Sequence, residues 1–201
     1  MGAVFGLSFF SPLLIPACVL IRLEGAKEAF FKQERLGKDG KTFMLYKLTT
    51  MDGDAHIKGA LLSKTDDPRV TKIGKIIRML SLNELAQFIN VLKGEMSIVG
   101  PRPEVPKYAK YWTEEVGEKI LSIKPGITGY GTIKYWQEGN MLNDKDDPEG
   151  YYINHIAPEK LRLESWYVDN WNLVLDFKLM LQTFCKAFSG QRKGNGSSLK
   201  L

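Results

Sequence analysis

Hydrophobic residues dominate the first 21 positions, "MGAVFGLSFFSPLLIPACVLI", which carry no charged side chain. As one straight helix this stretch would be about 31 Å long, enough to cross a bilayer once. However, Pro12 and Pro16 lie inside it, and an interior proline removes a backbone hydrogen bond and clashes with the preceding turn. The pattern therefore predicts a sharp bend at Ser11-Pro12. Because each half of about ten residues is too short to span, we expect a re-entrant membrane helix that enters and leaves by the same face.

Two other interpretations of this segment stay open: a plain spanning helix and a cleaved secretory signal. A signal peptide needs a basic stretch before its apolar run, and none precedes it here. "IPAC" around Cys18 only loosely resembles a lipoprotein cleavage site. Arg22, Lys27 and Lys32 follow the segment, and by the positive-inside rule they place the rest of the chain in the cytoplasm.

The next segment, "FFKQERLGKDGKTFMLYKLTTM", is typical of a β-hairpin. Gly37 and the Asp39-Gly40 pair separate two runs, and Asp-Gly between extended runs favours a tight turn. "KTFMLYKL" has the aromatic and apolar content of a strand. Residues 52–69, which are rich in Asp, Gly, Lys and Pro, predict a solvent-facing loop.

From Val70 the pattern becomes helical. Lys72, Lys75 and Arg78 recur every third residue beside an apolar face, which predicts a short basic amphipathic helix suited to a membrane surface, a phosphate or plain solvent. Ser81 and Glu84 then match the S-x-x-E capping box of a second helix. This helix has an apolar stripe that ends at a glycine, formed by Leu82, Leu85, Phe88, Ile89, Leu92 and Gly94. The capping box alone is enough to explain Glu84.

A proline-rich segment, "GEMSIVGPRPEVP", follows the second helix. Pro101, Pro103 and Pro106 predict an extended, rigid loop around Arg102. A guanidinium on a stiff loop is pre-organised for bidentate phosphate recognition, although a surface arginine among prolines would look the same. Further on, the Gly and Pro residues of "KPGITGYGTIKYW" predict another loop, and the segment has a strand-like end.

The C-terminal third predicts helices near 158–188. Ala157-Pro158 places a proline in the first turn of one helix. The last helix has an apolar stripe that could pack on the core, which we favour, or lie in the lipid interface; it consists of Leu173, Phe177, Met180, Leu181, Phe184 and Phe188, preceded by Trp166 and Trp171. The tail "SGQRKGNGSSLKL" has the composition of a disordered segment.

Length and charge narrow the class of protein. A chain of 201 residues fits one domain with appendages. The net charge of +5 favours an anionic partner, such as a phosphate ligand or an acidic membrane face, without requiring a nucleic acid. Cys18 and Cys185 lie far apart with no CxxC or Cys/His cluster, which argues against a disulfide framework or a zinc site.

In this order the segments resemble the bacterial sugar transferases, the small monotopic phosphoglycosyl transferases. The similarity covers nearly all of residues 8–188 and is most specific from Asp67 to Glu104. It is carried by the Ser-Pro bend, "QERLGKDGKTF", "YKLTTM", "DPRVTKIGKIIRMLSLNELAQFINVLKGEMSIVGPRPE", "KPGITG" and "LRLESWYVDNW…LDFKLMLQT".

The resemblance implies an α/β fold (α+β, helix-rich): a small monotopic domain on the cytoplasmic face of the bacterial inner membrane. Residues 1–22 would form the re-entrant helix with its hinge at Ser11 and Pro12, residues 23–189 the cytoplasmic domain, and residues 190–201 a disordered tail. Such enzymes use Mg²⁺ to move a sugar phosphate from a UDP-sugar to polyprenol phosphate. Family members associate in pairs, so the resemblance implies a dimer, with no role for nucleic acid.

In the family an Asp-Glu dyad starts the second helix. The aspartate attacks the β-phosphorus and carries the phosphosugar. By position, Glu84 matches the dyad glutamate and a Mg²⁺ ligand, while Lys47, Arg78 and Arg102 match basic residues around the phosphates. The nucleophile position is Asn83, whose amide has no anionic oxygen and offers Mg²⁺ only a neutral ligand, so the expected metal binding is weakened or lost.

Other departures accompany Asn83: Thr49 stands where the family has a cation, and Ala86 stands where it has a proline. They favour a pseudoenzyme that serves as a non-catalytic partner of an active relative. Activity through Glu84, Asp52 or Asp54 is one alternative, and an engineered Asp-to-Asn change is another. A membrane-surface module that holds nucleotide sugar or polyprenol phosphate without turnover would keep the same basic residues. The sequence does not identify the sugar.

Overall fold

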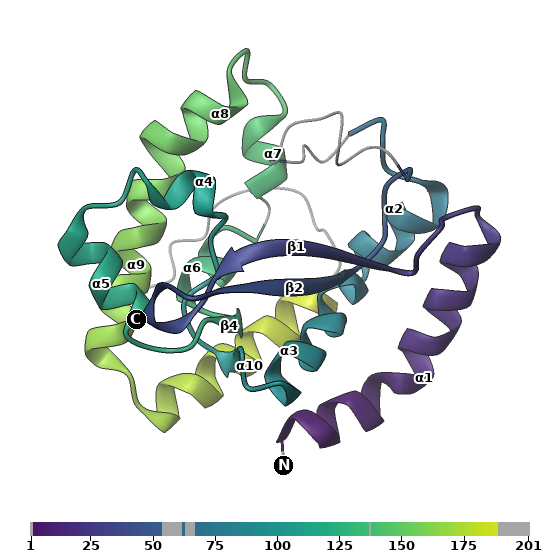
Figure 1. Ribbon diagram of the computed structural model, residues 1–201, viewed down its shortest axis with the longest axis horizontal. Helices are drawn as coiled ribbons and strands as arrows, with labels where there is room; N and C mark the ends of the chain where they lie inside the picture. The colour runs from purple at the N-terminus through teal and green to yellow at the C-terminus, as the bar shows by residue number, and fades with distance from the viewer. Residues whose placement is uncertain (1, 54–61, 63–66, 137, 189–201) are drawn as a thin grey trace.

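The computed structural model describes residues 2–53, 62, 67–136 and 138–188, and in them helices surround two small sheets (Figure 1). The predicted helix-rich mixed fold is confirmed. Most of the predicted 52–69 loop and the whole 190–201 tail lie outside the described residues. In Figure 1 the hairpin β1–β2 has α1 and α2 at one end and α4, α5 and α9 at the other.

The hairpin is formed as predicted by β1 (Phe30–Leu36) and β2 (Thr42–Leu48), which pair antiparallel with Leu36 opposite Thr42. A short 3₁₀ turn, η1 (Lys38–Gly40), joins them. Asp39 and Gly40 have φ values of 59° and 71°. This left-handed conformation is the reason that an Asp-Gly pair suits the turn.

Helix α1 (Gly2–Leu23) continues through Pro12 and Pro16 without a break in its helical assignment. The predicted bend therefore does not divide it into two helices, and whether the segment re-enters a membrane stays a prediction. Its inner face, Leu14, Ala17 and Ile21, packs on the hairpin and α2, and its exposed face carries Leu13, Ile15, Val19, Leu20 and Leu23. Among the described residues, no helix has the length and apolar character needed to cross a membrane.

The predicted basic helix is α2 (Lys72–Met79). Thr71 caps it, since its Oγ1 accepts a hydrogen bond from the Gly74 amide at 2.9 Å. A Cβ at Gly74 would lie 2.2 Å from the carbonyl oxygen of Thr50, so this glycine lets α2 approach the segment after β2. Ile77 is buried while Lys75 faces solvent, as the amphipathic pattern predicts.

The predicted capping box at Ser81 is wrong. Ser81 has a φ of 55°, in the left-handed region, and its side chain makes no capping hydrogen bond. A capping serine needs an extended backbone to aim its hydroxyl at the third amide of the helix. The left-handed turn instead leads into a 3₁₀ helix, η2 (Leu82–Gln87), and then into α3 (Phe88–Leu92).

The second sheet pairs β3 (Ser97–Val99) with β4 (Gly126–Thr128) in parallel. The strand-like end predicted after Gly129 is wrong, because residues Tyr130–Lys134 form helix α6. Ile133 of α6 is completely buried against α9 and α10. Tertiary burial therefore outweighs the local β propensity.

Short helices α4 (Pro106–Ala109), α5 (Glu114–Leu121), α7 (Glu138–Leu142) and α8 (Pro148–Tyr151) complete this region.

The two C-terminal helices are α9 (Ala157–Asn170), which follows a π-helical turn at Tyr152–Ile156, and α10 (Leu173–Phe188). The expectation that the α10 stripe packs on the core is wrong for most of it. Leu175 and Leu179 are buried, whereas Phe177 and Leu181 are 68% and 66% exposed. Residue i+2 lies on nearly the opposite side of a helix, so burying Leu175 exposes Phe177.

Candidate active site

The centre of the site is an ion pair between η2 and the proline-rich loop. Glu84 Oε1 accepts a hydrogen bond from Arg102 Nη2 at 3.0 Å, and both side chains are about a quarter exposed. The two residues are 18 positions apart in sequence. The structure therefore brings together two predicted site residues, and Glu84 has a tertiary partner in place of a capping role.

The electrostatics keep Glu84 ionised. Burial by itself raises the pKa of Glu84, but the positive charges of Arg102 and Lys47 outweigh this effect, so the net pKa is lowered. In turn the negative charge of Glu84 raises the pKa of the Arg102 guanidinium. The pair is a charge-assisted contact in which the carboxylate is already neutralised by a cation.

Lys47, near the end of β2, lies in the same electrostatic environment. Burial and the nearby charge of Arg102 lower its pKa to about 7. The charge of Arg78 contributes to the same shift. A lysine whose pKa lies near neutral pH becomes fully protonated when an anion binds beside it, because the negative charge favours the ammonium form.

Arg78 of α2 reaches the site from the other side. Its Nε donates a hydrogen bond to Thr50 Oγ1 at 2.9 Å. Burial lowers its pKa, and the charge of Asp67 opposes that shift. Arg78 and Arg102 therefore both lie within electrostatic reach of Lys47. That these three cations bind phosphate stays a prediction.

Asn83 lies beside this group in η2 and is partly exposed. None of the described residues makes a hydrogen bond or ion pair with its side chain. Of the two alternative carboxylates, Asp52 is exposed and Asp54 lies outside the described residues.

Ser11 and Pro12, the predicted membrane hinge, are not part of this group. They lie in α1, one turn before Leu14. Leu14 belongs to the apolar cluster that Leu82 and Leu85 of η2 also join. The expected membrane segment thus packs directly on the element that carries Asn83 and Glu84.

A buried network that the sequence did not reveal braces the Arg102 loop. Arg35 Nη1 donates to the carbonyl of Pro103 at 3.1 Å and lies 3.6 Å from Glu104 Oε1. Tyr152 donates to Glu104 Oε2 at 2.6 Å. Burial lowers the pKa of Arg35 to about 10. Arg35 and Glu104 do fall within the segments that resemble the family, but nothing in the sequence assigned either residue a role in this network.

The described residues do not fit a magnesium site built by the protein alone. They contain no group of three or more His, Cys, Asp or Glu side chains placed to hold a metal ion. Glu84 offers one carboxylate, which Arg102 already engages, and Asn83 offers a neutral oxygen. Mg²⁺ in proteins normally has one or two carboxylates besides substrate phosphates. The weakened or lost Mg²⁺ binding stays a prediction.

Comparisons with known proteins agree on one family. The chain matches the family model described as bacterial sugar transferase over residues 1–190. It is 40% identical over 186 residues to the uncharacterized sugar transferase EpsL of Bacillus subtilis (strain 168), which covers 92% of this chain and 82% of that protein.

Two further relatives carry reaction names. One is the UDP-N-acetylgalactosamine-undecaprenyl-phosphate N-acetylgalactosaminephosphotransferase of Aeromonas hydrophila, 33% identical over 192 residues, 94% of this chain and 42% of that protein. The other is the UDP-glucose:undecaprenyl-phosphate glucose-1-phosphate transferase of Escherichia coli (strain K12), 32% identical over 184 residues, 90% of this chain and 37% of that protein. This chain therefore spans less than half of these two relatives.

Proposed function

The chain belongs to the bacterial sugar transferase family, and on that premise we propose that it binds a UDP-sugar and polyprenol phosphate at the membrane without transferring the sugar phosphate. Its role would be that of a non-catalytic partner subunit of an active relative in glycoconjugate biosynthesis. The observation that carries this proposal is a carboxamide at position 83 beside a complete Glu84–Arg102 pair.

The retained cations support ligand binding. Arg102 and Arg78 present guanidinium groups, which recognise phosphate oxygens bidentately, and Lys47 adds a point charge. These residues come from a strand, a helix and a rigid loop, so the site is pre-organised before ligand arrives.

The altered dyad opposes the covalent route. Attack on phosphorus needs a nucleophile with an available electron pair of sufficient basicity, and the Asn83 carboxamide lacks one. Glu84 is a weak substitute, because its lowered pKa and its contact with Arg102 make the carboxylate a poorer nucleophile. Catalysis with Glu84 as the nucleophile is the alternative to a non-catalytic role.

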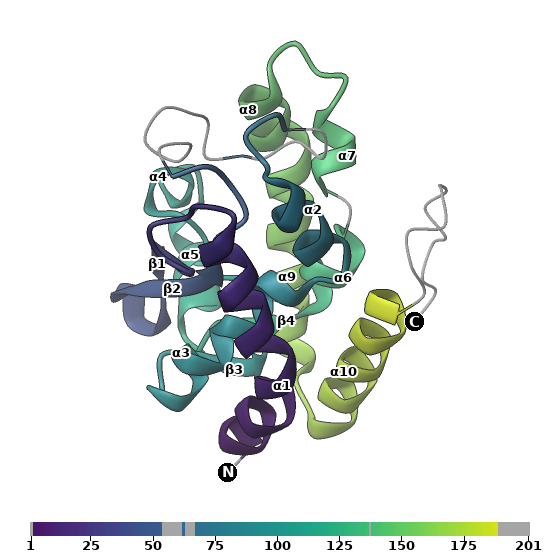
Figure 2. The same ribbon diagram turned by 90° about the vertical axis from the view of Figure 1, so that its right-hand side faces the viewer.

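Two apolar surfaces support a position at the membrane. Among the side chains that the structure describes, α1 exposes Leu13, Ile15, Val19, Leu20 and Leu23, and α10 exposes Leu173, Val174, Phe177, Leu181 and Phe184. Figure 2 shows α1 at the front of the molecule and α10 at its right edge, on adjoining sides. Exposed apolar surface of this extent is typical of contact with lipid or with another subunit.

The test is UMP release by the full chain in nanodiscs with polyprenol phosphate, Mg²⁺ and a panel of UDP-sugars. We expect no turnover by the wild type and turnover by Asn83→Asp, because the substitution restores the nucleophile to a retained pocket. Asn83→Ala is the matched control and should stay inactive. Turnover by the wild type that Glu84→Gln abolishes would instead establish the altered-dyad enzyme.

The partner role has a separate test. The chain is co-expressed with an active relative, and co-purification together with a change in the relative's rate supports the subunit role. A chain that binds UDP but never associates with a relative would be a binding module.

A further inference from the structure

Glu164 of α9 is a buried carboxyl that the proposed reaction does not use. Only 4% of the residue is exposed. Its Oε1 lies 3.3 Å from the backbone nitrogen of Arg102, which donates the hydrogen bond. Glu164 and Arg102 are 62 positions apart, so this contact ties α9 to the proline-rich loop.

The surroundings make room for this carboxyl. A Cβ at Gly131 of α6 would lie 2.4 Å from Glu164 Oε1, and one at Gly129 would lie 3.6 Å from Oε2. Glu164 Oε2 is buried and has no hydrogen-bond partner among the residues that the structure describes. Burying an incompletely bonded carboxyl is unfavourable, so an apolar side chain would fill this space better if packing were its only role.

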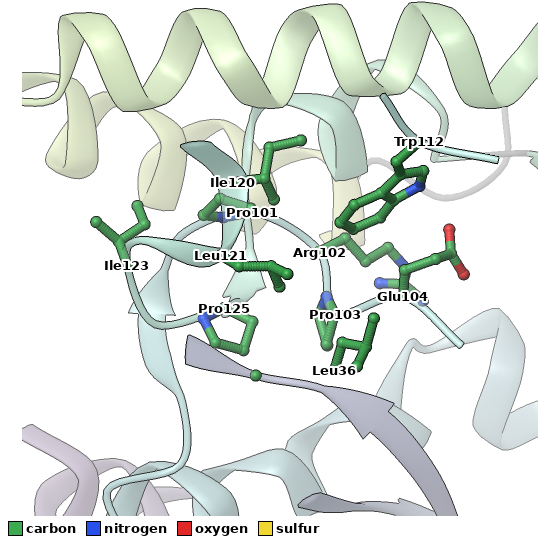
Figure 3. Close-up of a pocket in the computed structure, with 11 residues that line it drawn as sticks. Leu36, Pro101, Arg102, Pro103, Glu104, Trp112, Ile120, Leu121, Ile123 and Pro125 are labelled. Atoms are coloured by element: carbon green, nitrogen blue, oxygen red, sulfur yellow. The ribbon is translucent and has the colours of Figure 1, made fainter. Parts of the chain in front are cut away.

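The rest of the loop is held independently of Glu164. Figure 3 shows Pro101 and Pro103 among the apolar side chains of Leu36, Ile120 and Leu121. The Leu36 amide donates to the carbonyl of Glu104 at 2.9 Å. Arg102 itself is held at its guanidinium by Glu84 and at its amide by Glu164.

We propose that Glu164 is a positioning residue that holds the Arg102 amide, and thereby aims its guanidinium at the phosphate of the ligand. The contact stands on geometry alone, whereas its use in phosphate recognition rests on the proposed function. An arginine held both at its backbone amide and at its guanidinium loses less conformational freedom when it binds phosphate than one that is held at neither.

Hydrogen exchange of the Arg102 amide in the full chain tests the contact. Glu164→Ala should speed exchange roughly tenfold or more, as expected when a buried amide loses its acceptor. Glu164→Gln should restore slow exchange, because the side-chain carbonyl still accepts. Gly131→Ala should also speed it, since the new methyl group displaces the Glu164 carboxyl without changing its chemistry. Glu159→Gln is the matched control and should have no effect, because this half-buried glutamate of α9 pairs with Arg162 and not with Arg102.

UDP binding, measured by calorimetry on the same proteins, tests the consequence. We expect Glu164→Ala to weaken UDP about tenfold and Glu164→Gln to restore binding to within about twofold. Unchanged exchange in Glu164→Ala and Gly131→Ala overturns the contact. Faster exchange with unchanged UDP affinity overturns the positioning role. A wild type that binds no UDP removes the proposed function, while the exchange result still decides whether Glu164 holds Arg102.

Discussion

Asn83 and Glu84 are neighbours in the chain, yet the structure uses them differently. Glu84 is paired with Arg102 at 3.0 Å, whereas none of the described residues bonds to the Asn83 side chain. The Glu84–Arg102 pair therefore forms without help from the Asn83 side chain. A residue-level substitution can remove the chemical step and keep the binding site, which makes Asn83→Asp informative.

Lys47 makes ligand binding depend on pH. Its pKa of about 7 means that it loses its proton above neutral pH in the free protein, and a bound phosphate favours the charged form. UDP affinity should therefore fall as pH rises from about 7 to 9, by up to roughly tenfold per unit. Lys47→Arg stays charged and should lose this slope. Calorimetry in buffers of different ionisation enthalpy measures the proton uptake, and equal slopes in both proteins would contradict the assignment.

Asn83 also governs the response to metal. Because Arg102 already engages Glu84, the carboxylate next to Asn83 in the chain, we expect EDTA to change the UDP affinity of the wild type by less than about twofold. Asn83→Asp replaces a neutral amide oxygen with a carboxylate, so Mg²⁺ should tighten UDP binding to this variant by roughly several-fold. Titrations with Mg²⁺ and with EDTA measure the difference. Strong Mg²⁺ dependence in the wild type would show that the pocket recruits other ligands.

At the scale of elements, α10 shows how one helix divides its apolar residues between two surroundings. Leu175 and Leu179 contact the core, while Phe177 and Leu181 point away from it. Trp171, two residues before the helix begins, is 56% exposed. Aromatic and aliphatic side chains on one outward face, with Lys178 beside them, suit the boundary between headgroups and acyl chains.

Cys185 reports on that face, because it is an exposed residue of α10. In a Cys18→Ser variant in nanodiscs, a water-soluble maleimide should label Cys185 roughly tenfold more slowly than a cysteine that faces water, since lipid excludes the reagent. Lys110→Cys in a cysteine-free background is the matched control, because Lys110 is exposed on another element. Equal labelling rates would place the α10 face in water.

At the scale of the whole molecule, Glu164 couples folding to pH. Burial raises its pKa from 4.5 to about 7, so between these values the folded state keeps a proton that the unfolded state has lost. Folding stability should therefore fall as pH rises through this window, by up to ~3 kcal/mol, and stay level above it. Glu164→Gln has no proton to lose.

The stability advantage of Glu164→Gln over the wild type should thus increase from pH 5 to pH 8. Urea unfolding of both proteins at each pH measures it. A constant difference across this range would mean that the Glu164 carboxyl is solvated or paired in solution.

The sequence by itself determined the hairpin, the basic helix and the family, because turn chemistry, helical periodicity and family motifs are read from neighbouring residues. Through the family resemblance it also predicted Lys47, Glu84 and Arg102 as site residues, and its local pattern gave Glu84 a capping role that the left-handed Ser81 rules out. Only the tertiary structure decided which partner Glu84 takes, and that Glu164 lies against the Arg102 amide. Contacts between distant segments, and the choice of which face of an apolar helix is buried, depend on how the elements pack, and no local pattern encodes that packing.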